Sequence, residues 1–193
     1  MTSNSPLSKV HQLGQYGNFQ NKSTSQIIKI KEIKGIFIYQ LVKFKNSKKQ
    51  DNELVINNLN FPSALEVKSN NEIRILWMGP NNWLIFSSKN LHEDLNRDFP
   101  LNEFAVTDIS HSRSIIELQG LHVKEVIKKG SPFNIEELKK NCCANTVYNG
   151  ITITIDNLDY IENKIRVISL RSFGESLYHS VTDACLEFGF EAI

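Results

Sequence analysis

Short apolar runs separated by turn-forming residues dominate the chain, and they predict more strands than helices. Alternation and β-branched residues favour strands near residues 27–33, 35–45, 104–109, 113–118, 151–155 and 164–170. Helical spacing is confined to short segments, at 53–59, after Asn90, at 121–130, at 135–140 and from Ser172 to Gly189. Because these helices are scattered between the strands, the pattern predicts an α+β fold with a largely antiparallel sheet.

The strongest local signal is a hairpin at residues 73–86. Two β-favouring runs flank four turn-forming residues, Gly79-Pro80-Asn81-Asn82, and both tryptophans of the chain adjoin this turn. Trp77 ends the first run and Trp83 starts the second, which places two large apolar side chains near the turn. Two interpretations stay open: the indoles belong to the chain's own core, or the hairpin presents an apolar ridge to another protein.

The last helix has the clearest boundary signals. Ser172 and Glu175 fit a capping box, and Gly189 can end the helix. Apolar residues share one face at spacings of three and four: Leu177, Val181, Ala184 and Phe188.

Residues 1–25 contain few apolar anchors and are predicted to form an extended N-terminal arm. The apolar residues recur every three positions, which suggests that the arm lies on another surface: Leu7, Val10, Leu13, Tyr16 and Phe19. Residues 26–193 are predicted to form a single α+β domain, with two packed subdomains meeting near residue 100 as the alternative.

Charged residues are unevenly distributed along the chain. The first fifty residues hold nine lysines and one acid, a net charge of +8, whereas the remainder carries −7. Such asymmetry is typical of an arm that binds an acidic partner or phosphate, but a lysine-rich composition without a binding role is equally compatible. No apolar run is long enough to span a bilayer, and the first residues lack an apolar signal block. We therefore expect a cytoplasmic protein that does not bind a membrane.

The sequence offers little catalytic machinery. Three cysteines, an odd number, show no C-x-x-C spacing, so small buried side chains are expected rather than a disulfide framework, a redox dithiol or a metal site. Asp108, Ser110 and His111 lie within one short segment, but in an extended chain the first two side chains point away from the third. The segment is therefore predicted to be a polar turn, and no catalytic, cofactor-binding or metal-binding residue is expected.

Several motifs together resemble the gamma subunit of heterotetrameric sarcosine oxidase. They are S-P-L at residues 5–7, W-M-G-P-N-N-W-L-I-F at 77–86, D-I-S-H-S-R-S-I-I-E-L-Q-G at 108–120, V-I-K-K-G-S-P-F-N-I at 126–135 and L-R-S-F-G-E-S-L-Y-H-S-V at 170–181. The sequence departs from the family at Ser131, where a cysteine is usual, and at Ser180, where an aromatic residue is frequent.

The resemblance implies a noncatalytic subunit with alpha, beta and delta partners. The assembled enzyme would demethylate sarcosine with the help of FAD, FMN, NAD and zinc, all held by other subunits. The residues that carry the family pattern are also candidate interface residues: Trp77, Gly79, Pro80, Trp83, Arg171 and His179.

The middle of the chain also resembles the folate-binding aminomethyltransferases of the glycine-cleavage system. In that family acidic residues follow a glycine turn, whereas here Asn149-Gly150 is followed by residues 151–154 without a carboxylate. General acid–base chemistry on folate would need such an acid. A stand-alone folate-binding protein is therefore the alternative, and a basic nucleic-acid-binding module is disfavoured because aromatic and basic residues do not interleave.

Overall fold

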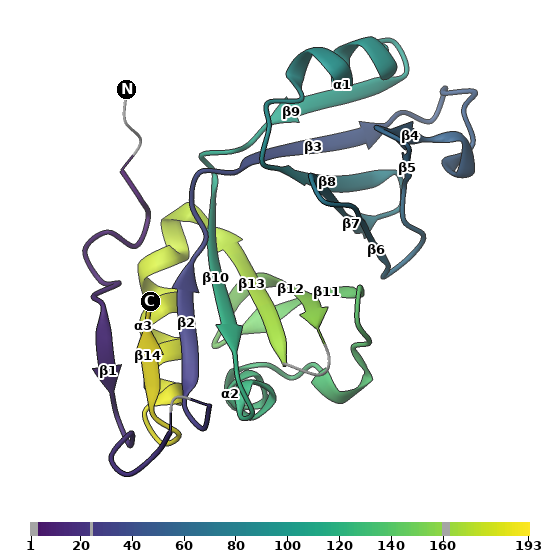
Figure 1. The fold of residues 1–193 in the computed structure, drawn as a ribbon. Coiled ribbons are helices and arrows are strands. Elements are labelled where there is room, and N and C mark those ends of the chain that lie inside the picture. Colours follow the sequence, from purple (N-terminus) through teal and green to yellow (C-terminus); the bar gives the residue numbers. More distant parts are fainter. Residues whose placement is uncertain (1–3, 24, 160–162) are drawn as a thin grey trace. The chain divides into compact units, whose positions relative to one another are not determined.

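A computed structural model describes residues 4–23, 25–159 and 163–193 (Figure 1). It divides into two compact units, and each is described here by itself. Unit 1 combines residues up to 34 with residues 112–193, and unit 2 comprises residues 35–111. The chain thus passes from unit 1 to unit 2 after Lys34 and returns to unit 1 after His111. Residues 1–3 and 24 of the predicted arm lie outside the described residues.

Unit 1 is built on a seven-stranded sheet in the order β1-β14-β2-β10-β13-β12-β11. All neighbouring strands are antiparallel except β14 and β2. The strands are β1 (Gly14–Tyr16), β2 (Ile28–Glu32), β10 (Arg113–Gln119), β11 (Cys143–Tyr148), β12 (Ile151–Asp159), β13 (Lys164–Leu170) and β14 (Phe190–Ala192).

Helices α2 (Val123–Gly130) and α3 (Gly174–Cys185) pack against one face of this sheet (Figure 1). Both helices bury their apolar stripes in one core, in which Val126, Leu177 and Val181 are fully inaccessible to solvent. Short 3-10 turns precede β11 and α3, at η2 (Ile135–Glu137) and η3 (Arg171–Phe173). Because η3 occupies the predicted start of the last helix, Ser172 does not cap it, and the predicted capping box is wrong.

Unit 2 holds a five-stranded antiparallel sheet in the order β6-β7-β8-β3-β9 and a separate two-stranded sheet. Its elements are β3 (Phe37–Lys43), η1 (Asp51–Glu53), β4 (Val55–Ile56), β5 (Leu59–Asn60), β6 (Val67–Ser69), β7 (Ile73–Gly79), β8 (Asn82–Ser87), α1 (His92–Asp98) and β9 (Phe104–Asp108). The helix predicted at 53–59 is wrong. Asn57 and Asn58 both adopt positive φ angles, 47° and 61°, which a tight hairpin between β4 and β5 requires.

The observed architecture confirms the predicted α+β class with largely antiparallel sheets. None of the three cysteines forms a disulfide in the part of the chain that the structure describes; Cys143 and Cys185 are buried as expected, whereas Cys142 is partly exposed. None of the helices within the described residues is long and apolar enough to cross a membrane.

Candidate functional site

The tryptophan hairpin forms as the sequence predicts. Trp77 and Trp83 lie directly opposite each other on β7 and β8, with a bulge between Trp77 and Gly79. The strands are joined by Pro80 and Asn81, and Asn81 adopts a positive φ of 60°. Asparagine tolerates this conformation better than most residues, so the local sequence explains the tight turn.

The two indoles face the core of unit 2. Trp83 is only 1% exposed, its Nε1–H donates a hydrogen bond to the carbonyl of Pro62 at 3.2 Å, and its ring meets Phe61 edge-on at 5.4 Å. Trp77 packs against the same core cluster but remains partly exposed. Pro80, at the turn, also belongs to the family pattern, and its side chain is exposed. The core interpretation therefore holds for Trp83.

The segment around Asp108 forms the expected polar turn. The Asp108 carboxylate accepts hydrogen bonds from the Ser110 backbone N–H at 2.9 Å and from its hydroxyl at 2.6 Å. The Ser110 oxygen in turn accepts from the backbone N–H of Ile38 at 2.9 Å. Partial burial raises the pKa of Asp108, but the bonds from Ser110 and the nearby histidines outweigh it, and the pKa lies below its ordinary value. The hydroxyl is bonded to a carboxylate rather than to an imidazole base, which is not the arrangement of an activated nucleophile.

A second cluster of candidate residues lies on unit 1, where residues 4–16, here called the N-terminal strap, cross the start of α3. Arg171, in η3, donates a hydrogen bond from Nη2 to the Asn4 carbonyl. Gly174 allows close packing at this point: a Cβ there would lie 2.9 Å from the Ser114 hydroxyl and 3.4 Å from Pro6. The R-S-F-G segment at residues 171–174 therefore contacts the strap. This contact accounts for the position of Arg171 without a bound phosphate or other ligand.

The strap is anchored along its length. The Ser5 hydroxyl donates to the buried carboxylate of Glu32 at 2.6 Å, and Leu7 is fully buried in the core of unit 1. Val10 and Tyr16 pack against the same core, whereas Leu13 is 73% exposed. The three-residue recurrence of apolar side chains was thus the sequence signal that this segment lies on another surface, and that surface belongs to the chain itself.

His11 fixes the middle of the strap to both α3 and the end of the described chain. Its Nε2 lies 3.2 Å from the carbonyl oxygen of Ile193, which can only accept, so Nε2 carries the proton. In the neutral ring Nδ1 then accepts from the Tyr178 hydroxyl at 3.0 Å. Burial and, to a smaller extent, Tyr16 raise the pKa of Tyr178 to about 12, which keeps this hydroxyl protonated as a donor.

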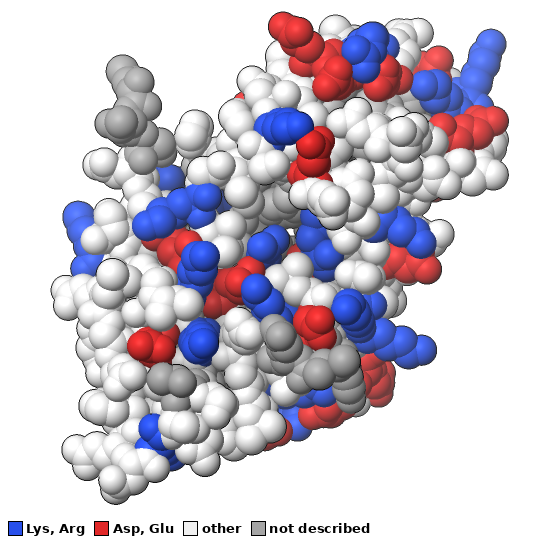
Figure 2. Space-filling model, in the orientation of Figure 1, with Lys and Arg blue, Asp and Glu red and all other residues white. Residues whose placement is uncertain are grey.

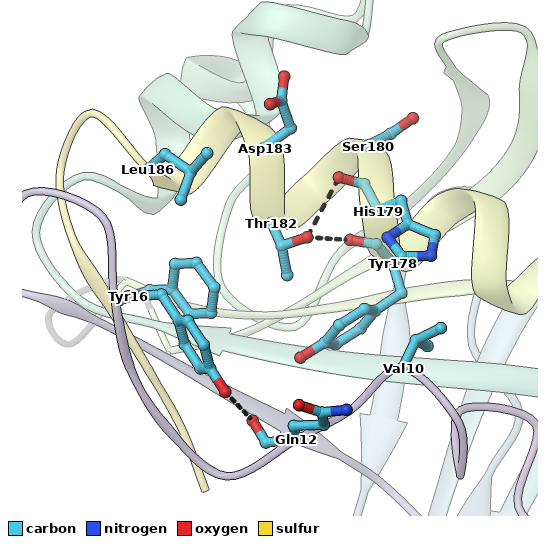
Figure 3. Close-up of a pocket in the computed structure, with 10 residues that line it drawn as sticks. Val10, Gln12, Tyr16, Tyr178, His179, Ser180, Thr182, Asp183 and Leu186 are labelled. Carbon is cyan, nitrogen blue, oxygen red and sulfur yellow. Dashed lines mark hydrogen bonds between the residues drawn. The ribbon is translucent and has the colours of Figure 1, made fainter.

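A groove of about 620 Å³ lies between the strap and α3 (Figure 3). Apolar and aromatic side chains form part of its lining, and polar groups of α3 and Gln12 of the strap form the rest. The lining residues are Val10, Gln12, Tyr16, Tyr178, His179, Ser180, Thr182, Asp183, Leu186 and Phe190. His179, a candidate interface residue, therefore lines this groove, whereas no local pattern in the sequence predicts the groove or the strap contacts that build it.

The lysines of the first fifty residues do not form one basic arm, because the chain passes from unit 1 to unit 2 at residue 35. Lys34 pairs with Glu32 in unit 1, and Lys43 pairs with Asp51 in unit 2. Figure 2 shows positive and negative side chains interspersed on the visible face. Within the described part of the chain, no group of three or more His, Cys, Asp or Glu side chains is placed to hold a metal ion.

Comparison with known proteins agrees with the motifs. No family model matches the sequence. The sarcosine oxidase subunit gamma of Corynebacterium sp. (strain U-96) is 26% identical over 121 residues, which cover 59% of this chain and 57% of that relative's length. The chain is similar to that gamma subunit over this stretch. The match therefore confirms the resemblance inferred from the motifs, over a little more than half of each sequence.

Two solved structures support the fold. A chain of heterotetrameric sarcosine oxidase from Corynebacterium sp. U-96 superposes with a TM-score of 0.80 at 20% identity and covers 97% of both chains. Aminomethyltransferase T of the glycine cleavage system from Bartonella henselae gives a TM-score of 0.59 at 12% identity, over 82% of this chain and 46% of the enzyme. The chain thus shares its fold with both, as the sequence predicted, and spans about half of the aminomethyltransferase.

Proposed function

We propose that this chain is the noncatalytic gamma subunit of a heterotetrameric sarcosine oxidase. The observation that carries the proposal is the agreement of a sequence match to a gamma subunit with a fold match over 97% of a chain from the assembled enzyme. The partners would be the alpha, beta and delta subunits. The complex would convert sarcosine to glycine, with hydrogen peroxide and either formaldehyde or 5,10-methylenetetrahydrofolate as the other products.

In this proposal the chemistry belongs to the other subunits, which would hold FAD, FMN, NAD and zinc. The most reactive-looking segment of this chain supports that division, because the Ser110 hydroxyl is bonded to Asp108 and to the backbone of unit 2. The role left for the chain is assembly: it would cover surface of its partners and stabilise them by binding only their folded form.

The test is co-expression of the alpha, beta and delta subunits from the same organism with and without this chain. We expect the four-subunit preparation to hold full flavin and to oxidise sarcosine, and the three-subunit preparation to lose flavin or to assemble poorly. Complete flavin loading and full turnover without this chain would contradict the proposal. A simpler observation bears on it too: genes for flavin-dependent amine oxidase subunits are expected beside this gene.

The fold match to aminomethyltransferase T makes a stand-alone folate-binding protein the second candidate. The structure bears on it at the β11–β12 hairpin, where Asn149 and Gly150 form the turn and Ile151 begins the next strand. The first four residues of that strand carry no carboxylate for proton transfer to folate. Binding of tetrahydrofolate to the purified chain alone, measured by calorimetry, would favour this candidate over the first.

A further inference from the structure

The groove between the strap and α3 is held open by contacts on both sides. On the strap side, the Tyr16 hydroxyl donates to the Gln12 carbonyl at 3.2 Å, and the Tyr16 ring stacks on Phe190 with centroids 5.1 Å apart. On the helix side, the Thr182 hydroxyl donates to the Tyr178 carbonyl at 2.8 Å. Figure 3 shows the Tyr16 and Tyr178 rings on either side of an open space. The groove is therefore preformed, which lowers the entropic cost of filling it.

The end of the groove is fixed by a close approach of two backbones. The N–H of Asn18 donates to the Leu186 carbonyl at 2.8 Å. A Cβ on Gly17 would lie 2.4 Å from that same carbonyl oxygen, and Gly17 adopts a φ of +73°, so only glycine suits this position. The strap cannot move away from the end of α3 without breaking this contact.

The groove adjoins a free sheet edge. Strand β1 is the last strand of the seven-stranded sheet, and among the described residues only β14 pairs with it. The apolar side chains near this edge are exposed, with Leu13 at 73% and Leu186 at 43%. An unpaired strand edge beside exposed apolar side chains is the arrangement that an extended peptide recognises, through backbone bonds and alternate side chains.

The charge of the groove favours a peptide that carries a basic side chain. Among the described residues that line the groove, Asp183 is the one carboxylate and none is a lysine or arginine. The Asp183 side chain is exposed and extends from α3 on the side opposite to the Tyr16 and Tyr178 rings (Figure 3). Within the described residues Asp183 has no ion pair, whereas Glu187, one turn further along, is paired with Lys129 at 2.7 Å. A basic side chain on the incoming segment would complement this carboxylate.

We propose that the groove and the adjoining edge of β1 bind an extended segment of a partner subunit that places apolar side chains beside Leu13 and Leu186 and a lysine or arginine at Asp183. This inference rests on the proposed function, since the partner is one of the other oxidase subunits. It assigns the contact to residues of unit 1 rather than to the tryptophan hairpin of unit 2.

The test measures binding of the full chain to the purified complex of the other three subunits by biolayer interferometry. Two variants alter the groove: Asp183→Lys reverses its charge, and Leu13→Glu places a charge at its apolar edge. Two controls make the same changes at exposed positions outside the groove, Glu175→Lys on the same helix and Leu121→Glu in the same unit. Because Leu13 is 73% exposed, its substitution leaves the fold intact, which near-ultraviolet circular dichroism checks.

We expect each groove variant to raise Kd at least tenfold and each control to change it less than threefold. Higher salt should weaken binding of the native chain, and it should have much less effect on Asp183→Asn, which lacks the charge. Binding of both groove variants with the native Kd would overturn the inference and leave the proposed function intact. Failure of the native chain itself to bind the other subunits would overturn both.

Discussion

Replacing each tryptophan by alanine tests how the hairpin is used. Trp83 is 1% exposed, so Trp83→Ala removes a fully buried indole, and large-to-small changes of this kind cost about 3–5 kcal/mol. The change also leaves the Pro62 carbonyl without the donor that now lies 3.2 Å away. Trp77 is partly exposed, so its removal returns less apolar surface to water and should cost about 1–2 kcal/mol.

The assay is urea unfolding followed by tryptophan fluorescence. Both tryptophans belong to unit 2, and each alanine variant keeps the other indole as its reporter, so the signal describes this unit alone. With a slope of about 1 kcal/mol per molar urea for a unit of this size, Trp83→Ala should lower the midpoint by about 3 M or unfold the unit outright. Trp83→Phe is the control, because it keeps an aromatic ring and removes only the N–H and part of the volume.

An equal loss of stability in the two alanine variants, or a larger loss for Trp77, would refute this reasoning. It would mean that the hairpin packs differently against the core of unit 2 from the arrangement described. A Trp83→Phe variant as unstable as Trp83→Ala would instead assign most of the effect to the hydrogen bond with Pro62.

Three further predictions concern unit 1. Hydrogen bonds from two lysines lower the pKa of Glu136 from its ordinary 4.5 to about 2. The contribution of Glu136 to the free energy of unfolding is therefore present above pH 4.5 and is lost as the pH falls towards 2. Glu136→Gln should reduce the dependence of this free energy on pH over that range, and an unchanged dependence would contradict the prediction. Burial raises the pKa of Cys185 to about 12, so a thiol reagent should label the partly exposed Cys142 first, and rapid labelling of Cys185 in the native protein would show that its surroundings open. Gly130→Ala should destabilise the protein by about 1–3 kcal/mol, because the new methyl group would lie 2.5 Å from the buried Tyr148 ring, whereas the same change in an unhindered helix is stabilising.

Local chemistry explains why the hairpins could be predicted in part. At residues 73–86 the turn residues and the flanking β-branched runs indicate the same structure, and the chain adopts it. At residues 53–59 the spacing of apolar residues predicts a helix, whereas the two asparagines favour a turn. Their positive φ angles produce a hairpin instead, so turn chemistry outweighed periodicity there.

Pairing between distant segments explains what the sequence could not show. Strand β2 lies between β14 and β10, so residues near 30 bond to residues near 191 and near 117. Local sequence patterns do not predict which distant strands pair with each other, and the division of the chain into two units depends on that pairing. The groove has the same origin, since it needs the strap and α3 to meet across more than 160 residues, as the hydrogen bond from the Tyr178 hydroxyl to His11 shows.

The structure therefore separates two kinds of family-pattern residue that look alike in the sequence. Trp83 is part of the core of unit 2, where its side chain is buried and donates a hydrogen bond to the Pro62 carbonyl. Arg171 and His179 instead lie where the strap crosses α3, one holding the strap and the other lining the groove beside it. Substitution of a buried residue such as Trp83 should lower the free energy of unfolding, whereas substitution of an exposed groove residue such as Asp183 should weaken assembly with little change in that free energy. The two measurements together distinguish a folding residue from a binding one.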